Sequence, residues 1–148
     1  MSEKSLVDII VNSKLKFPWR KRKKLFCATE VKSIFSRVDI VYFKPRDNDE
    51  IDFIIAVEVK LRNWKKALQQ AHRNKLFANR VYVALPEKFS SAAIANISEF
   101  RNASVGLILV EKNSSIIYFN PPINDFRSPL HFNKVCESLK TITNLRFS

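Results

Sequence analysis

The sequence predicts an α/β domain in which a mixed β-sheet is flanked by α-helices. Short runs rich in β-branched and aromatic residues recur along the chain, which is typical of strands. An apolar run at 51–61 is followed by an amphipathic stretch at 64–78 and a further apolar run at 80–86. This pattern indicates a strand–helix–strand unit with parallel strands. Hydrophobic residues are 46% of the 148-residue chain, so one domain with a real core is expected.

The strands follow from composition and from the turns between them. We expect strands at residues 25–31, 37–43, 51–61, 80–86, 105–110 and 115–119. The continuous apolar stretch at 51–61 is typical of a central strand covered on both faces. The Pro, Asp and Asn residues of 44–49 favour a turn before it.

The helices follow from hydrophobic periodicity. Residues 64–78 place Trp64, Ala67, Leu68 and Ala71 on one stripe, and Asn63 can cap the helix. Further helices are expected at 87–102 and 130–144, whereas residues 6–11 suit either a short helix or a strand. The resulting single domain has a basic N-terminal segment (1–24), a core (25–119) and a C-terminal loop and helix (120–148).

Composition excludes several classes of site. Gly106 is the single glycine, which excludes glycine-rich phosphate loops and dinucleotide fingerprints. Cys27 and Cys136 are far apart, which argues against a zinc site or a disulfide scaffold and favours a reducing cytoplasm. No apolar run reaches membrane-spanning length and the N-terminus lacks signal-peptide architecture, so no membrane association is expected.

Positive charge is the strongest bulk feature. Lys and Arg number 26 against 14 Asp and Glu, for a formal net charge of +12. A field of this sign attracts polyanions, and nucleic acid is the commonest large one. Residues 14–24 are dense in Lys and Arg, so they suit either a basic arm on a phosphate backbone or a solvated loop. The predicted contacts in this segment are Arg20, Lys21, Arg22, Lys23 and Lys24.

Charged residues interrupt the end of the most apolar strand. Glu58 and Lys60 project to the same face because side chains alternate along a strand. If strands 37–43 and 51–61 form a hairpin, Asp39 approaches Glu58. Two close carboxylates raise each other's pKa unless a cation lies between them, and hard oxygen ligands suit Mg²⁺ or Mn²⁺. Such an ion can activate water, and a neighbouring lysine can orient that water.

Two alternatives compete with this site. Glu58 and Lys60 could form a surface ion pair at an exposed strand end, with little energetic weight. Glu30 and Lys32 repeat the same Glu-Val-Lys spacing, and Asp8 precedes them, so these three residues form a second candidate set of two acids and a lysine. We favour the later pair, because it ends the most apolar strand and leads into an amphipathic helix.

Asp39, the stretch AVEVKL at 56–61 and the helix beginning NWKKALQQA resemble the core of the PD-(D/E)xK nuclease superfamily. The resemblance covers about residues 28–85 and implies a restriction-endonuclease-like fold. It implies that Asp39 and Glu58 bind metal and that Lys60 is the catalytic lysine. It also suggests the Val59 carbonyl as a further ligand and Glu30 as an additional upstream acid. Val38 stands where the superfamily has its eponymous proline.

Many members carry a glutamine on the helix after the lysine. Gln69 and Gln70 both compete for this role. At about 100° per residue, Gln70 lies nearer the apolar stripe and therefore nearer the sheet, so we select it as a catalytic-site residue. Lys66 and Arg73 share its face as predicted phosphate contacts. The remaining predicted nucleic-acid contacts are Arg37 and Arg62.

The expected function is therefore a Mg²⁺-dependent (or Mn²⁺-dependent) DNA endonuclease. No segment resembles a separate target-recognition domain, so cleavage guided by DNA structure or by a partner protein is expected rather than sequence-specific cutting. A homodimer would cut two strands most easily. The main alternative is a nucleic-acid-binding protein that retains the fold without catalysis. The third is an unrelated basic RNA- or ribosome-binding protein.

Overall fold

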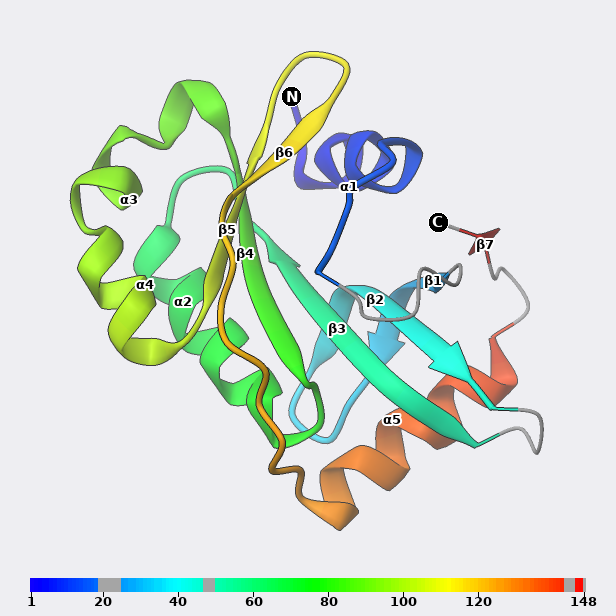
Figure 1. The fold of residues 1–148 in the computed structure, drawn as a ribbon. Coiled ribbons are helices and arrows are strands. Elements are labelled where there is room, and N and C mark those ends of the chain that lie inside the picture. The colour runs from blue at the N-terminus through cyan, green and yellow to red at the C-terminus, as the bar shows by residue number, and fades with distance from the viewer. Residues whose placement is uncertain (19–24, 47–49, 143–145, 148) are drawn as a thin grey trace.

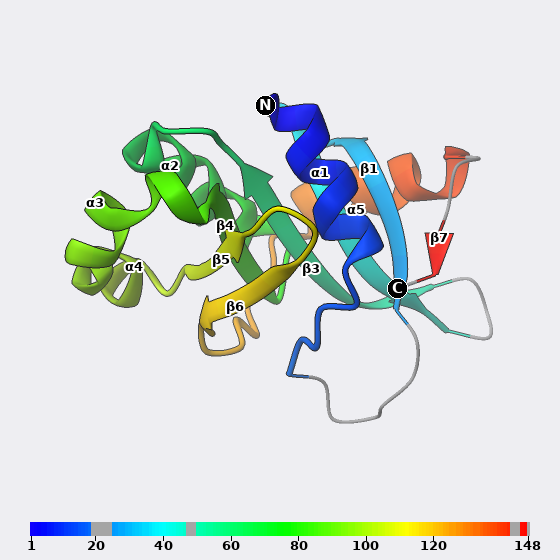
Figure 2. The ribbon, with the colours of Figure 1, turned by 90° about the horizontal axis from the view of Figure 1, so that it is seen from above.

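The chain folds as a mixed β-sheet between two layers of helices (Figures 1 and 2), as the sequence predicts. The structure is a computed structural model that describes residues 1–18, 25–46, 50–142 and 146–147. Within these ranges the sheet has seven strands in the order β6-β5-β4-β3-β2-β1-β7. The strands are β1 (Phe26–Lys32), β2 (Arg37–Pro45), β3 (Ile51–Val59), β4 (Arg80–Pro86), β5 (Gly106–Val110), β6 (Ser115–Phe119) and β7 (Arg146–Phe147).

The strand pairing follows the predicted pattern of a hairpin and a crossover. β1, β2 and β3 pair antiparallel in sequence, and β3 then pairs parallel with β4 across the predicted strand–helix–strand unit. β5 pairs parallel with β4, and β6 closes one edge antiparallel to β5. The end of β3 therefore lies beside the start of β2. This arrangement brings residues from two strands together at one end of the sheet.

Helices cover both faces of the sheet, with α1 on one side and α2 to α5 on the other (Figure 1). Their bounds are α1 (Glu3–Asn12), α2 (Trp64–Arg73), α3 (Ser91–Ala95), α4 (Ile97–Ala103) and α5 (Pro129–Thr141). The apolar run at 6–11 is thus helical, and Leu6 and Ile10 are fully buried against the sheet. Ser2 and Ser5 cap the start of α1 reciprocally, which fixes its first turn.

Two predicted helices are shorter than their hydrophobic patterns suggest. α2 ends at Arg73, and a 3₁₀ turn, η1 (Asn74–Leu76), replaces the rest of the expected helix. The stretch at 87–102 divides into a 3₁₀ turn, η2 (Glu87–Phe89), and helices α3 and α4, which meet at Asn96. At the end of α2, the 3₁₀ turn directs the buried Asn74 side chain toward β3, where it donates a hydrogen bond to Glu58.

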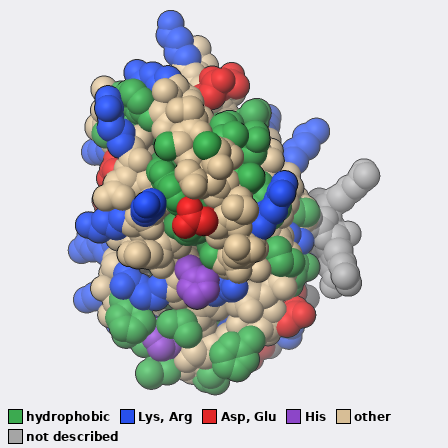
Figure 3. Space-filling view, turned by 90° about the vertical axis from the view of Figure 1, so that its left-hand side faces the viewer, with side chains coloured by type: hydrophobic (Ala, Val, Ile, Leu, Met, Phe, Trp, Pro, Cys, Tyr) green, Lys and Arg blue, Asp and Glu red, His purple; other side chains and the backbone are tan. Residues whose placement is uncertain are grey.

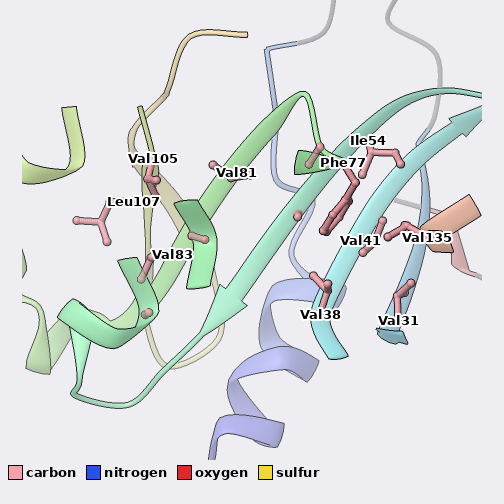
Figure 4. Close-up of a cluster of buried hydrophobic side chains, with 14 of the residues drawn as sticks. Val31, Val38, Val41, Ile54, Phe77, Val81, Val83, Val105, Leu107 and Val135 are labelled. Carbon is pink, nitrogen blue, oxygen red and sulfur yellow. The ribbon is translucent and has the colours of Figure 1, made fainter. Parts of the chain in front are cut away.

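The core lies on both sides of the sheet, and the larger cluster faces α2, α4 and α5 (Figure 4). Val41 of β2, Ile54 of β3 and Val135 of α5 meet there. Gly106 explains the single glycine of the chain. A Cβ atom at Gly106 would lie 2.4 Å from the Tyr82 ring and 2.7 Å from Pro121, so close packing requires a residue without one.

Of the helices in the described ranges, none combines the length and the apolarity that a membrane crossing would need.

Candidate active site

Two acidic side chains meet where β2 begins and β3 ends. Ile40 pairs with Val57 across the hairpin, so the next opposed positions are Asp39 and Glu58. Their carboxyl groups are in hydrogen-bonding contact. The convergence that the hairpin predicts is therefore present.

The structure excludes the interpretation of Glu58 as part of an exposed strand end. Its relative accessibility is 4%, and the even-numbered residues before it in β3, Ile54 and Ala56, belong to the core cluster beneath α2. Burying a carboxyl group in apolar surroundings is unfavourable unless its oxygens find partners. Asn74 supplies one of these, because its Nδ2 donates to Glu58 Oε1 over 2.8 Å.

Asp39 is only partly buried and is held by the backbone of the neighbouring strand. Its Oδ2 accepts a hydrogen bond of 2.8 Å from the backbone N–H of Val59. This bond holds the carboxyl group at the end of β3. On its other side, Asp39 lies at an irregular point of the ladder between β1 and β2, because the pair Glu30 and Asp39 is absent from that ladder.

The two carboxyl groups hold protons more tightly than ordinary ones. Burial raises the pKa of Glu58 to about 8, and the negative charge of Asp39 adds to the effect. Burial also raises the pKa of Asp39, although the hydrogen bond from Val59 opposes the shift. The hydrogen bond between them favours charge on Asp39 and protonation of Glu58. Without a cation, burial and the neighbouring charge therefore favour a proton retained on Glu58.

Lys60 lies close enough to both acids for its ammonium charge to stabilise each ionised form. The residue is half-buried, and its backbone N–H donates to the carbonyl of Ala84 over 3.1 Å. The strand ladder with β4 thus continues to Lys60, although β3 itself ends at Val59.

Sequence reasoning missed two residues at this site. Asn74 lies beyond the end of α2, where the periodic pattern predicts only more helix. Glu3 lies in the first turn of α1, and its Oε2 accepts from the backbone N–H of Leu61 over 3.3 Å. Its negative charge contributes to the raised pKa of Asp39. No signal in the sequence connects Glu3 with the strand end, because their contact spans nearly sixty positions.

Glu30 occupies a different environment from the acid pair. It is exposed, has a positive φ of 52°, and lines a groove between β1 and α5 with Lys134 and Glu137. Among the residues that the structure describes, no three His, Cys, Asp or Glu side chains form a group that could hold a metal ion. Neither Glu30 nor the rival set with Asp8 is therefore assembled into such a group. The role of Glu30 as a ligand stays a prediction.

The predicted glutamine faces the interior, as its helical position suggests. Gln70 is half-buried, whereas Gln69 is exposed. Gln70 Oε1 is fully buried without a hydrogen-bond partner in the structure. A buried amide oxygen without a partner is costly and unusual, so the Gln70 side chain has a hydrogen-bonding capacity that the fold leaves unused.

The predicted nucleic-acid contacts fall into two groups. Arg37, Arg62, Lys66 and Arg73 are all exposed, and all come from segments near the ends of β2, β3 and α2. Arg62 lies over the Phe89 ring, with 4.1 Å between the guanidinium carbon and the ring centroid. The five basic residues predicted at positions 20–24 lie outside the described residues.

Comparison with known proteins supports the fold. No protein-family model matches the chain, and no curated protein matches its sequence. The solved structure of SPO1766, a protein of unknown function from Silicibacter pomeroyi, is similar with a TM-score of 0.55 and 18% identity. That match covers 78% of this chain and 73% of the other. Similarity at this identity shows the fold alone.

A second solved structure, SfsA from Pyrococcus furiosus in complex with Ca²⁺, is more distant. Its TM-score is 0.33 with 12% identity, and the match covers 65% of this chain and 55% of that one. This similarity is too low to carry an inference. Membership in the PD-(D/E)xK superfamily therefore stays a prediction from the residues that resemble it.

Proposed function

We propose that the chain is a Mg²⁺- or Mn²⁺-dependent DNA endonuclease of the PD-(D/E)xK type. One observation carries the proposal: Asp39 and Glu58 converge at the end of the sheet, with the Lys60 amine close to both. A surface ion pair would not require a buried acid with a pKa raised to about 8. Perturbed acids beside a lysine are typical of sites that do chemistry.

The residues present suit a hard divalent cation. The pair tolerates its own charge only by retaining a proton, and a cation between the carboxylates would replace that proton. Mg²⁺ is commonly held by one or two carboxylates and keeps several waters, so a third acidic ligand is not required. Asp39 and Glu58 would hold the ion, with the Val59 carbonyl as the further predicted ligand. When bound, the ion would acidify water and stabilise charge on a phosphate.

The neighbouring residues have separate tasks. Lys60 would orient the attacking water or neutralise charge on the phosphate. Asn74 would hold Glu58 in place through its amide hydrogen bond. Gln70 would be the glutamine that many members of the superfamily carry on the helix after the lysine. The exposed cations Arg37, Arg62, Lys66 and Arg73 would bind the DNA backbone, where each neutralised phosphate releases counterions.

One observation favours the alternative of a non-catalytic DNA-binding protein. The described residues contain no cluster of three His, Cys, Asp or Glu side chains that could hold a metal ion. A protein that uses only its positive charge would need no metal. The two proposals differ in whether phosphodiester bonds break and whether Mg²⁺ binds.

The deciding experiment compares labelled duplex, flap, junction and single-stranded DNA in Mg²⁺, in Mn²⁺ and in a chelator. Lys60→Ala should abolish cleavage while leaving DNA affinity nearly unchanged. Lys140→Ala is the matched control, because it removes the same charge from an exposed position on α5. Cleavage by Lys60→Ala at the rate of the unmodified protein would refute the assignment. DNA binding with no cleavage of any substrate would favour the non-catalytic alternative.

A further inference from the structure

An exposed aromatic ring lies in the turn that precedes the strand of Asp39. Phe35, in the turn between β1 and β2, is 57% exposed, which is unusual for a side chain of this size. The turn is held in shape, because the N–H and the hydroxyl of Ser33 both donate to the Ser36 carbonyl, over 2.8 Å and 2.7 Å. The ring is therefore displayed by an ordered turn.

Two neighbours fix the orientation of the Phe35 ring. The Arg73 guanidinium carbon lies 5.1 Å from its centroid, and Arg73 also bonds the Ser36 hydroxyl over 3.5 Å. The His131 ring lies 5.3 Å away at an interplanar angle of 30°, and its Nδ1 lies 2.9 Å from the Ser128 hydroxyl. A planar cation, an imidazole and an exposed benzene ring thus form one surface, which we call the Phe35 platform.

The platform is connected to the acid pair through two short segments. Asp39 follows Phe35 by four residues, so their Cα atoms are at most about 14 Å apart along the chain. Arg73 immediately precedes Asn74, whose amide bonds Glu58. A nucleic acid strand with a phosphate at the acids could therefore place a nearby base on the platform.

We propose that the Phe35 platform binds an unpaired DNA base beside the phosphate held at the acid pair. Bases in a duplex are stacked on their neighbours, whereas unpaired bases stack on aromatic rings and on Arg planes. The platform combines these two groups, and Arg73 adds positive charge for the adjoining phosphate. The inference rests on the proposed function and deepens it, because it selects DNA with unpaired nucleotides over uniform duplex.

The charge of the chain agrees with a polyanionic ligand rather than an apolar one. Figure 3 shows one face of the molecule, across which Lys and Arg side chains are spread with hydrophobic side chains between them. The chain as a whole carries a formal charge of +12. This charge would attract the phosphates of a nucleic acid strand, whereas it would contribute nothing to the binding of an apolar partner.

The test measures DNA binding in a chelator, so that it does not depend on cleavage. Two ligands are compared by fluorescence anisotropy: a duplex with a single-stranded tail, and the same molecule with an abasic tail. The phosphates are identical, so the difference in affinity reports base stacking alone. We expect the abasic tail to bind roughly 5- to 150-fold more weakly, the range for the loss of one stacked base.

Substitutions assign the effect to the platform. Phe35→Leu should bind both tails equally and weakly, whereas Phe35→Trp should keep the preference for bases. Tyr118→Leu is the matched control, because Tyr118 is 47% exposed on β6, at the far edge of the sheet from β2. Because Phe35 and Tyr118 are both surface residues, thermal melting should show that every variant is folded.

Each outcome separates the platform from the nuclease proposal. Equal affinity of the unmodified protein for the two tails overturns the platform, while metal-dependent cleavage of either substrate would leave the proposed function standing. A base preference that Phe35→Leu abolishes, without cleavage, supports the platform and refutes the nuclease. A dimer in sedimentation that Phe35→Leu dissociates, without any base preference, would make the surface a subunit contact and overturn the inference.

Discussion

Replacing Glu58 with Gln should stabilise the protein in the absence of metal. The glutamine Oε1 can still accept the 2.8 Å hydrogen bond from Asn74, and its amide N–H₂ can donate to Asp39 in place of the shared proton. The substitution therefore preserves the contacts of the protonated acid and removes its ability to ionise. What changes is the response of stability to pH.

The sign follows from the direction of the pKa shift. Glu58 has its pKa raised from 4.5 to about 8, chiefly by burial, so the folded protein binds this proton more tightly than the unfolded chain. The stability of the unmodified protein therefore falls as pH rises from 4.5 to 8, and Glu58→Gln escapes the loss. At pH 7 the difference is about 3 kcal/mol, from 1.36 kcal/mol for each pH unit above the unfolded value. This corresponds to a rise in melting temperature of roughly 10 °C.

Urea unfolding in a chelator measures this difference at several pH values. The advantage of Glu58→Gln should vanish near pH 4.5 and grow steadily toward pH 8. Glu99→Gln is the control, because Glu99 is exposed on α4, where substitutions usually change stability by less than about 0.5 kcal/mol. If Glu58→Gln is no more stable than the unmodified protein at pH 7, or gains as much at pH 4.5, then Glu58 is not a buried acid that retains its proton.

Three further predictions concern metal binding at the acid pair, the hydrogen bond of Asn74 and the close packing at Gly106. Mg²⁺ binding should release the proton of Glu58, so the affinity for Mg²⁺ should rise about tenfold per pH unit below pH 8. Calorimetry measures this affinity, and a value independent of pH would contradict a site at the acid pair. Asn74→Ala should lower the free energy of unfolding by about 1–3 kcal/mol, because Glu58 loses a buried partner, and it should raise the Glu58 pKa further, which titration by NMR would detect. Gly106→Ala should cost about 1–3 kcal/mol in denaturant unfolding, because its Cβ would meet the Tyr82 ring; an unchanged midpoint would show that β5 can shift.

Local patterns were sufficient to predict most of the fold. The apolar run of β3 and the stripe of α2 are both regular enough to locate a strand, a helix and the parallel pairing with β4. Helix ends were less predictable. Residues 74–78 continue the apolar period, but the chain leaves α2 at Arg73 because Asn74 bonds a buried acid on another strand. A period calculated along one helix contains no information about such a partner.

The candidate site shows the same division. Asp39 and Glu58 could be paired from the sequence because a hairpin fixes the register of opposing residues, and the structure places them opposite each other. Glu3 could not be found in this way, since α1 reaches the site from the other face of the sheet, where Glu3 bonds the backbone of Leu61. Glu30 has the same Glu-Val-Lys spacing as Glu58, but its backbone leaves the regular strand conformation, which the spacing does not reveal.

The chemistry of the acid pair depends on how the protein resolves a conflict between burial and charge. Core packing around β3 excludes water from Glu58, and the same exclusion makes its ionised form unfavourable. A proton relieves the conflict in the free protein, and a divalent cation would relieve it more fully, because it could neutralise both carboxylates together. Sequence spacing alone cannot distinguish such a site from a surface ion pair, since Glu30 and Lys32 have the same spacing and are both exposed. What separates the two pairs is that β3 is covered on both faces, so burial by the fold converts an ordinary Glu-Val-Lys sequence into a candidate metal site.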